Sequence, residues 1–145
     1  MRLQAAFHLH ALGRDAVLFA GGTGITAFTA FLEGLAPVEN VSVTLAYGAR
    51  TYQLLIYRET VERCARRLSS LDPIFFVEQL SQEGASARAV AREGALSVGA
   101  VWSRLRRPLD SNYYISGPPP MLKSIGDDLR RHNIPAEAIH IDAWE

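Results

Sequence analysis

Residues 20–26 of the chain read Ala20-Gly21-Gly22-Thr23-Gly24-Ile25-Thr26, and this stretch decides the fold. It follows an apolar run, residues 16–20, that is short enough to be a buried strand of a parallel sheet. It precedes apolar residues spaced as one face of a helix: Ile25, Phe28, Leu32 and Leu35. The glycines are therefore predicted to lie at a strand-to-helix turn.

A glycine-rich turn of this kind suits a pyrophosphate. The first backbone N–H groups of a helix have no partner within the helix, and the helix dipole favours negative charge there. Glycine also lets the backbone approach a phosphate closely. The alternative is a turn that only tightens the packing of helix on strand. The spacing departs from G-x-G-x-x-G at Ala27, and no Lys-Ser or Lys-Thr follows as in a P-loop.

The composition favours one folded domain and argues against several other classes of protein. The chain has 145 residues, of which 48% are hydrophobic and 21% are charged. Its 15 basic and 15 acidic residues cancel, which argues against a nucleic-acid binder. The single cysteine, Cys64, excludes an internal disulfide and a cysteine metal cluster, and the dispersed histidines give no metal site. No apolar run reaches the roughly 18 residues of a membrane span. His8 and His10 interrupt any signal-peptide core, so a cytoplasmic location is expected.

The rest of the chain alternates between strand-like and helix-like segments. Further strands are predicted at residues 41–47, 74–77, 112–116 and 139–144. Four helices are also predicted. The first ends near Gly34, and the second carries Leu54 and Leu68. The third spans residues 98–106, and the fourth starts within the prolines at 118–120. The pattern around Gly94 is weak. The expected fold is α/β, a five-stranded parallel sheet with helices on both faces, formed by residues 14–145 after a lead-in at residues 1–13.

In such a sheet, ligands bind at the carboxyl ends of the strands. Four predicted loops meet there, at residues 21–26, 48–50, 81–83 and 116–120. Two of them are polar and contain glycine. Together these loops favour a nucleotide-binding sheet more strongly than any single motif does.

Four motifs resemble those of the ferredoxin–NADP reductase superfamily, in the family's order and at its spacing. Residues 20–26 resemble its first glycine motif, and Tyr47-Gly48-Ala49-Arg50 resembles the motif after its second strand. Residues 54–59 are similar to its adenine-side segment, and Ser116-Gly117-Pro118-Pro119-Pro120-Met121 to its Cys/Ser-Gly-Pro-x-x-Met motif. The resemblance covers about residues 16–145 and identifies the chain with the NAD(P)-binding half of such a reductase.

This resemblance implies hydride transfer between NADPH or NADH and FAD, with electrons passed on to an iron–sulfur protein, a flavodoxin or an oxygenase. In the family a flavin-binding barrel with an Arg-x-Tyr-Ser/Thr motif precedes the nucleotide domain, and the chain lacks that motif. Only residues 6–9 resemble the end of such a barrel. FAD is therefore expected on a separate flavin domain or subunit, and the isolated chain should be inactive without it. The alternative is a non-catalytic, nucleotide-responsive regulatory subunit of an electron-transfer complex.

The resemblance also implies roles for individual residues. Those expected to contact the nucleotide are Gly21, Gly22, Thr23, Gly24, Ile25, Thr26, Tyr47, Gly48, Arg50, Tyr57, Arg58, Ser81, Gly117, Pro118, Pro119 and Met121. Ser116 would lie near the hydride path, where many members have Cys, and Trp144 would cover the flavin ring. Tyr57 would stack on adenine. The alternatives are a strand-end turn for Ser116, core packing for Trp144 and a half-buried helix position for Tyr57.

The choice between the two nucleotides depends on charge near the adenosine ribose. Arg50 stands where NADPH-using members often have an arginine, whereas Gln82 departs from their second arginine. An amide cannot form a charge pair with a 2′-phosphate, although Arg58 could supply one. No acidic residue ends the second strand to hold a ribose hydroxyl. These features favour NADPH over NADH.

Two further expectations concern Gly24 and the arginines of residues 88–107. Valine at Gly24 should abolish nucleotide binding with little loss of fold, by blocking the phosphate and resisting positive φ. The arginines are interpreted as a solvated face, with an acidic electron-transfer partner as the alternative.

Overall fold

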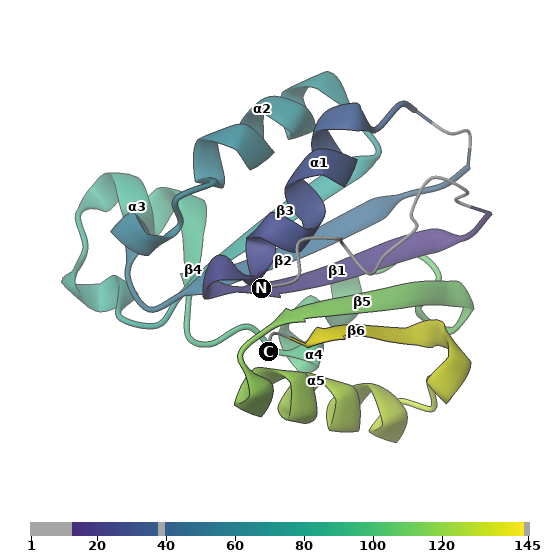
Figure 1. Ribbon diagram of the computed structural model, residues 1–145. Helices are drawn as coiled ribbons and strands as arrows, with labels where there is room; N and C mark the ends of the chain where they lie inside the picture. Colours follow the sequence, from purple (N-terminus) through teal and green to yellow (C-terminus); the bar gives the residue numbers. More distant parts are fainter. Residues whose placement is uncertain (1–12, 38–39, 144–145) are drawn as a thin grey trace.

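Six parallel strands form a single sheet in the order β4-β3-β2-β1-β5-β6 (Figure 1). The computed structural model describes residues 13–37 and 40–143. The strands are β1 (Asp15–Gly21), β2 (Val43–Ala49), β3 (Leu71–Val77), β4 (Ala91–Glu93), β5 (Ser111–Gly117) and β6 (Ile139–Ala143). β1 and β2 are buried along their whole length, as expected for central strands of a parallel sheet covered on both faces.

Helices cover both faces of the sheet. On one face lie α1 (Thr26–Gly34), α2 (Arg58–Arg67) and α3 (Ala85–Val90), and on the other lie α4 (Val98–Val101) and α5 (Pro119–Arg131). Phe28 and Leu32 of α1 join the first core cluster, and Leu122 and Ile125 of α5 join the second. Short 3₁₀ turns connect these elements: η1 (Gly22–Ile25), η2 (Tyr52–Leu54), η3 (Leu80–Gln82), η4 (Trp102–Arg104), η5 (Pro108–Asp110) and η6 (Ala136–Ala138).

The predicted α/β class and the parallel sheet are confirmed, with one strand more than expected. The additional strand, β4, is only three residues long and pairs with the last residues of β3. It lies next to Gly94, where the sequence pattern is weak. Such a short strand is stabilised by its neighbour and leaves little periodicity of its own.

Three predicted boundaries are wrong by three residues or more, and β2 lies two residues later than predicted. β3 begins at Leu71 and includes Pro73, because β4 reaches only as far as Phe75 and leaves β3 at an open edge there. The helix expected to carry Leu54 begins only at Arg58, after the turn η2. The predicted helix at residues 98–106 is the four-residue α4 followed by η4.

The predicted ends of two other helices are confirmed. α1 ends at Gly34, and α5 begins at Pro119, inside the run of prolines. Residues 1–12 of the predicted lead-in (residues 1–13) and Trp144 lie outside the described residues. Among the helices that the structure describes, none has both the length and the apolar character needed to cross a bilayer.

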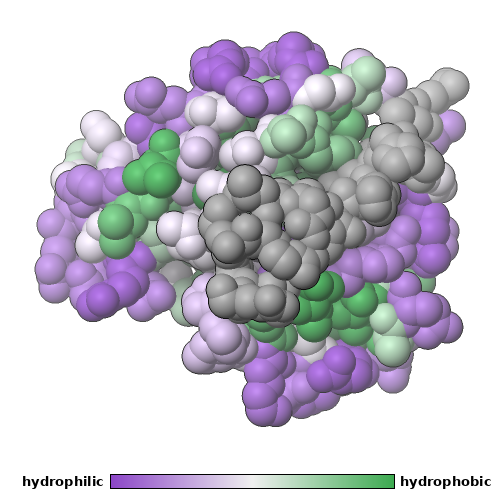
Figure 2. Space-filling model, in the orientation of Figure 1, coloured by the Kyte–Doolittle hydropathy of each residue, from purple (hydrophilic) through white to green (hydrophobic). Residues whose placement is uncertain are grey.

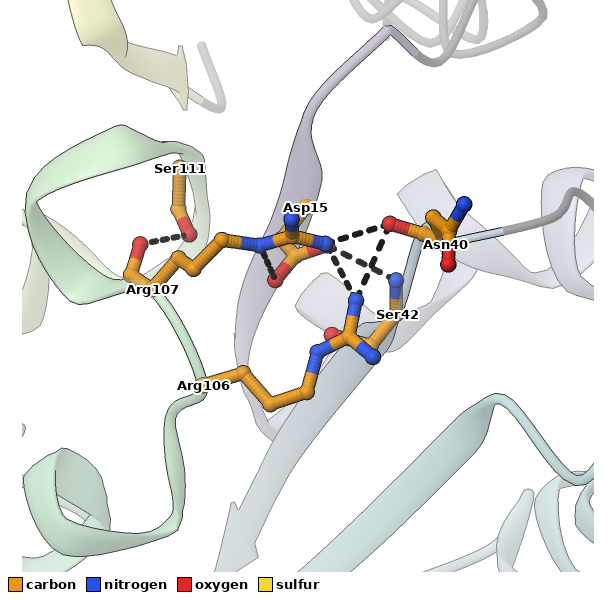
Figure 3. Close-up of polar contacts among 6 residues, drawn as sticks. All are labelled: Asp15, Asn40, Ser42, Arg106, Arg107 and Ser111. Atoms are coloured by element: carbon orange, nitrogen blue, oxygen red, sulfur yellow. Dashed lines mark hydrogen bonds and ion pairs between the residues drawn. The ribbon is translucent and has the colours of Figure 1, made fainter.

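The amino-terminal end of the sheet is closed by a buried carboxylate (Figure 3). Asp15 is 3% exposed and accepts hydrogen bonds from the backbone N–H of Ser42 at 2.9 Å and from Arg107 at 3.2 and 3.3 Å. Arg106 lies 3.4 Å from the same carboxylate, and both arginines also donate to the carbonyl oxygen of Asn40. Burial by itself would raise the pKa of Asp15. The hydrogen bonds from Ser42 and the two arginines outweigh burial, so the pKa lies below its ordinary value.

Candidate nucleotide-binding site

A cavity of about 820 Å³ lies at the carboxyl ends of the central strands. This is the position at which open parallel α/β sheets bind ligands. Three of the four predicted loops contribute to its wall, and the loop at 81–83 does not. The predicted site residues in the wall are Gly21, Gly22, Thr23, Gly48, Arg50, Gly117, Pro118 and Met121. Apolar side chains make up most of the remaining wall, as in many sites for small organic ligands.

Three glycines at strand ends lie directly beneath two side chains of the cavity wall, those of Met121 and Leu96. A Cβ atom on Gly21 would lie 2.3 Å from the Met121 sulfur, and one on Gly117 would lie 2.7 Å from the same atom. A Cβ on Gly48 would lie 2.8 Å from Leu96. Because these glycines have no Cβ, the side chains of Met121 and Leu96 pack directly on the ends of β1, β2 and β5.

The glycine turn uses its glycines for two different purposes. Gly22 has a φ of +55°, a conformation that side chains disfavour, and nothing lies within 4 Å of a Cβ placed there. At Gly24 a Cβ would lie 2.2 Å from the carbonyl oxygen of Ser116. Gly24 therefore lets η1 pack against the backbone of β5. The expectation that valine at this position would spare the fold is wrong, because its side chain would meet the backbone of β5.

Only the first part of the turn faces the cavity. Gly22 and Thr23 begin η1 and lie in the cavity wall, so the start of this helical segment is next to the open space. Ile25 is fully buried in the core, and the Thr26 hydroxyl donates to the carbonyl oxygen of Thr23 at 3.0 Å. Of the predicted turn residues, Gly24, Ile25 and Thr26 thus support the turn from behind.

One side of the cavity combines apolar side chains with two charged ones. Leu54 and Ile56 follow β2 and are 52% and 65% exposed, and they share the wall with Arg50 and Glu78. Exposed hydrophobic surface is visible at the left of Figure 2, on the side where α3 lies in Figure 1. Apolar residues of this size, left in solvent at a cavity, are suited to a flat ring such as adenine.

Four residues predicted to contact the nucleotide on this side lie away from the cavity wall: Tyr47, Tyr57, Arg58 and Ser81. Tyr57 donates its backbone N–H to the hydroxyl of the fully buried Tyr47 at 3.3 Å, and burial is the main cause of the raised pKa of Tyr47. Arg58 binds Glu62 at 2.8 Å and lies over the ring of Tyr52. Ser81 is in η3 and is exposed to solvent. Ile56, one residue before Tyr57, lines the cavity instead.

The other side of the cavity is formed by the start of α5. Pro118, Pro120 and Met121 line it, together with Ser124 and Ile125, while Pro119 is exposed outside the wall. Ser116 also lies outside the wall and is fully buried. Its neighbour Ile115 packs in the cluster beneath α5, so Ser116 points to the opposite face of the sheet. In the described parts of the chain its hydroxyl has no hydrogen-bond partner.

The sequence reasoning missed two parts of the wall. Glu78 directly follows β3, three residues before the Ser81-Gln82 pair to which the sequence pattern pointed. Ala95 and Leu96 come from the weakly patterned stretch after β4. An acidic residue immediately after a predicted buried strand is the signal that could have revealed Glu78.

Comparison with known proteins places these features in a family. Residues 18–127 match the model of the oxidoreductase NAD-binding domain. The chain is 25% identical over 144 residues to oxidoreductase NAD-binding domain-containing protein 1 of Bos taurus, covering 90% of this chain and 46% of that protein. It is 26% identical to the electron transfer component of anthranilate 1,2-dioxygenase of Acinetobacter baylyi, covering 83% of this chain and 34% of that protein. The chain thus spans about half the length, or less, of these curated relatives.

Solved structures share the fold. The FAD/NAD-binding domain of nitric oxide dioxygenase from Vibrio cholerae superposes with a TM-score of 0.77 at 17% identity, over 92% of this chain and 52% of that one. The CS-b5R domains of human Ncb5or give a TM-score of 0.69 at 24% identity, over 91% of this chain and 37% of that one. At these identities the likeness establishes the fold, and the match to the family model covers most of the chain. The chain therefore belongs to the oxidoreductase NAD-binding domain family, with the fold of the nucleotide domains of ferredoxin reductase-like proteins.

Proposed function

We propose that the chain binds NADH or NADPH in the carboxyl-end cavity and presents the nicotinamide to FAD held by a separate flavin domain or subunit. The observation that carries this proposal is the cavity floor. Gly21, Gly48 and Gly117 end three strands beside the turn at Gly22, and without a Cβ they let Met121 and Leu96 pack closely enough to form this floor. A dinucleotide has two flat rings joined by a pyrophosphate, and the cavity offers apolar walls on both sides of a glycine turn.

Each part of the nucleotide has a proposed position. The pyrophosphate lies against Gly22 and Thr23, at the start of η1. The adenosine lies between the apolar pair Leu54 and Ile56 and the charges that follow β2 and β3. The nicotinamide lies against Pro118, Pro120 and Met121, which exclude water from its side of the cavity. When bound, the reduced nicotinamide supplies the hydride for the flavin.

Ser116 and Trp144 belong to the flavin side of this proposal. Ser116 is buried on the face of β5 opposite the cavity, so its hydroxyl would meet the nicotinamide only if the ring extended past the end of that strand. Relatives are named as an electron transfer component of a dioxygenase and as the ferredoxin reductase component of a monooxygenase. These names support an electron-transfer role with an iron–sulfur protein as the acceptor, and a flavodoxin is the alternative that the motif resemblance implies.

Calorimetric titration of the purified chain with NADH and NADPH tests the proposal. We expect saturable binding of one nucleotide per chain, competition by ADP-ribose, and a colourless protein without FAD. Binding of neither nucleotide would overturn the proposal. Anaerobic bleaching by NADH of FAD held on a separately supplied flavin domain should be faster with the chain present. Nucleotide binding with no effect on flavin reduction would instead support the regulatory alternative.

A further inference from the structure

The end of β3 brings a carboxylate next to Arg50 in the cavity wall. The parallel register pairs Gly48 with Phe76 and Ala49 with Val77. Two backbone hydrogen bonds continue this ladder, from Glu78 to the carbonyl oxygen of Ala49 and from Gln79 to that of Arg50, both at 3.1 Å. Glu78 therefore stands opposite Arg50, with the two backbones about 5 Å apart.

Both side chains point to the same face of the sheet. Phe76 packs in the cluster beneath α4 and α5, whereas Val77 packs in the cluster beneath α1 and α2. Alternation places Glu78 on the face of Phe76 and Arg50 on the face of Gly48. Both residues are exposed and both line the cavity.

Neither charge is used elsewhere in the part of the chain that the structure describes. No salt bridge there includes Arg50 or Glu78, in contrast to Arg58, which is paired with Glu62 at 2.8 Å. The cavity wall therefore presents one positive and one negative group side by side, both available to a ligand.

We propose that Glu78 determines which nucleotide the site accepts, by binding the adenosine ribose of NADH and disfavouring the 2′-phosphate of NADPH. This inference rests on the proposed function. A carboxylate accepts a hydrogen bond from a ribose hydroxyl, and such charge-assisted bonds are strong. A 2′-phosphate carries close to two negative charges, so Glu78 repels it while Arg50 attracts it. Glu78 therefore opposes the advantage that Arg50 alone would give to NADPH.

The test uses ADP-ribose and its 2′-phosphorylated analogue, which carry the adenosine end without the nicotinamide. Each is titrated calorimetrically into the wild-type chain and into Glu78→Gln. We expect the wild type to bind ADP-ribose about tenfold more tightly than the analogue, and we expect Glu78→Gln to abolish this preference through a change of about tenfold in the ratio.

Glu93→Gln is the matched control. Glu93 pairs with Val77 in the register of β3 and β4, is exposed, and lies on the face opposite the cavity. This variant removes the same charge from a neighbouring strand, and its binding ratio should equal that of the wild type. A wild-type preference for the phosphorylated analogue, an unchanged ratio in Glu78→Gln, or an equal shift in Glu93→Gln would each overturn the inference while leaving nucleotide binding established. If neither ligand binds, both the inference and the proposed function fail.

Discussion

The two ends of the sheet differ in whether their charged groups have partners within the described chain. At the amino-terminal end, Asp15 is 3% exposed and its oxygens are occupied by Ser42, Arg106 and Arg107. At the carboxyl end, Arg50 and Glu78 stand in a cavity wall with no ion-pair partner among the residues described. The first arrangement stabilises the fold, because every charge has its partner within the chain. The second leaves its charges available to a ligand. Whether a charged side chain is already paired within the chain therefore distinguishes a structural cluster from a candidate site.

Substitution of Gly24 tests whether the carboxyl end also has a purely structural part. Gly24→Ala should lower the free energy of unfolding by about 2–4 kcal/mol, because its Cβ would lie 2.2 Å from the Ser116 carbonyl oxygen. Urea denaturation measures the effect. Gly99→Ala is the control, since nothing lies within 4 Å of a Cβ there. Equal stability of the two variants would mean that η1 does not pack closely on β5.

Removing the buried carboxylate tests the amino-terminal end. Asp15→Ala should cost about 2–3 kcal/mol of stability, because it leaves two arginines and the Ser42 N–H without their acceptor. Affinity for the nucleotide should not change at a temperature where the variant is folded. Asp110→Ala removes an exposed carboxylate paired with Arg14 and should cost less than about 1 kcal/mol. A loss of nucleotide affinity in Asp15→Ala would contradict the conclusion that the amino-terminal cluster has only a structural role.

Acid should weaken the same cluster. The folded pKa of Asp15 lies below its ordinary value of 3.8, so the ionised carboxylate contributes stability above that pH. This contribution is lost as the pH falls from about 4 through the folded pKa. Melting temperatures measured across this range should fall more steeply for the wild type than for Asp15→Asn. Parallel curves for the two proteins would show that Asp15 does not contribute to acid sensitivity.

Arg50→Ala tests whether the unpaired arginine at the carboxyl end binds the 2′-phosphate of NADPH. It should weaken NADPH binding by about tenfold and leave NADH nearly unchanged, because a guanidinium pairs with a phosphate more strongly than with a hydroxyl. Paired titrations at fixed salt concentration provide the measurement. An equal loss for both nucleotides would place Arg50 at the pyrophosphate. No loss for either would remove it from the site.

Ser116→Ala should have the smallest effect on stability. The Ser116 hydroxyl is buried without a hydrogen-bond partner in the described residues, so its removal should change the free energy of unfolding by less than about 1 kcal/mol and in the stabilising direction. Chemical denaturation beside the wild type checks this. Marked destabilisation would indicate that the hydroxyl has a partner after all.

The parts of the fold that the sequence predicts well are those with a local cause. The apolar runs of β1, β2 and β5, the glycine turn and the prolines before α5 each carry their own signal. β4 and the short α4 do not, because three or four residues are too few to show a period.

The same limit explains what the sequence misses at the site. Glu78 matters only because the register of β2 and β3 places it opposite Arg50, and register is a tertiary property. Whether Ile56 or Tyr57 faces the cavity depends on where α2 begins. Helix boundaries are poorly predicted when no cap residue marks them, and Tyr57 makes no side-chain cap.

The cluster at Asp15 also has a consequence for the order of folding. Its bonds to Arg107 join residues 92 positions apart, so they can form only after most of the chain has been brought together. Closing a loop of that length carries an entropic cost before any contact is gained. The cluster should therefore be absent from the folding transition state. Its loss should speed unfolding while leaving the folding rate nearly unchanged, so Asp15 acts mainly on the lifetime of the native state.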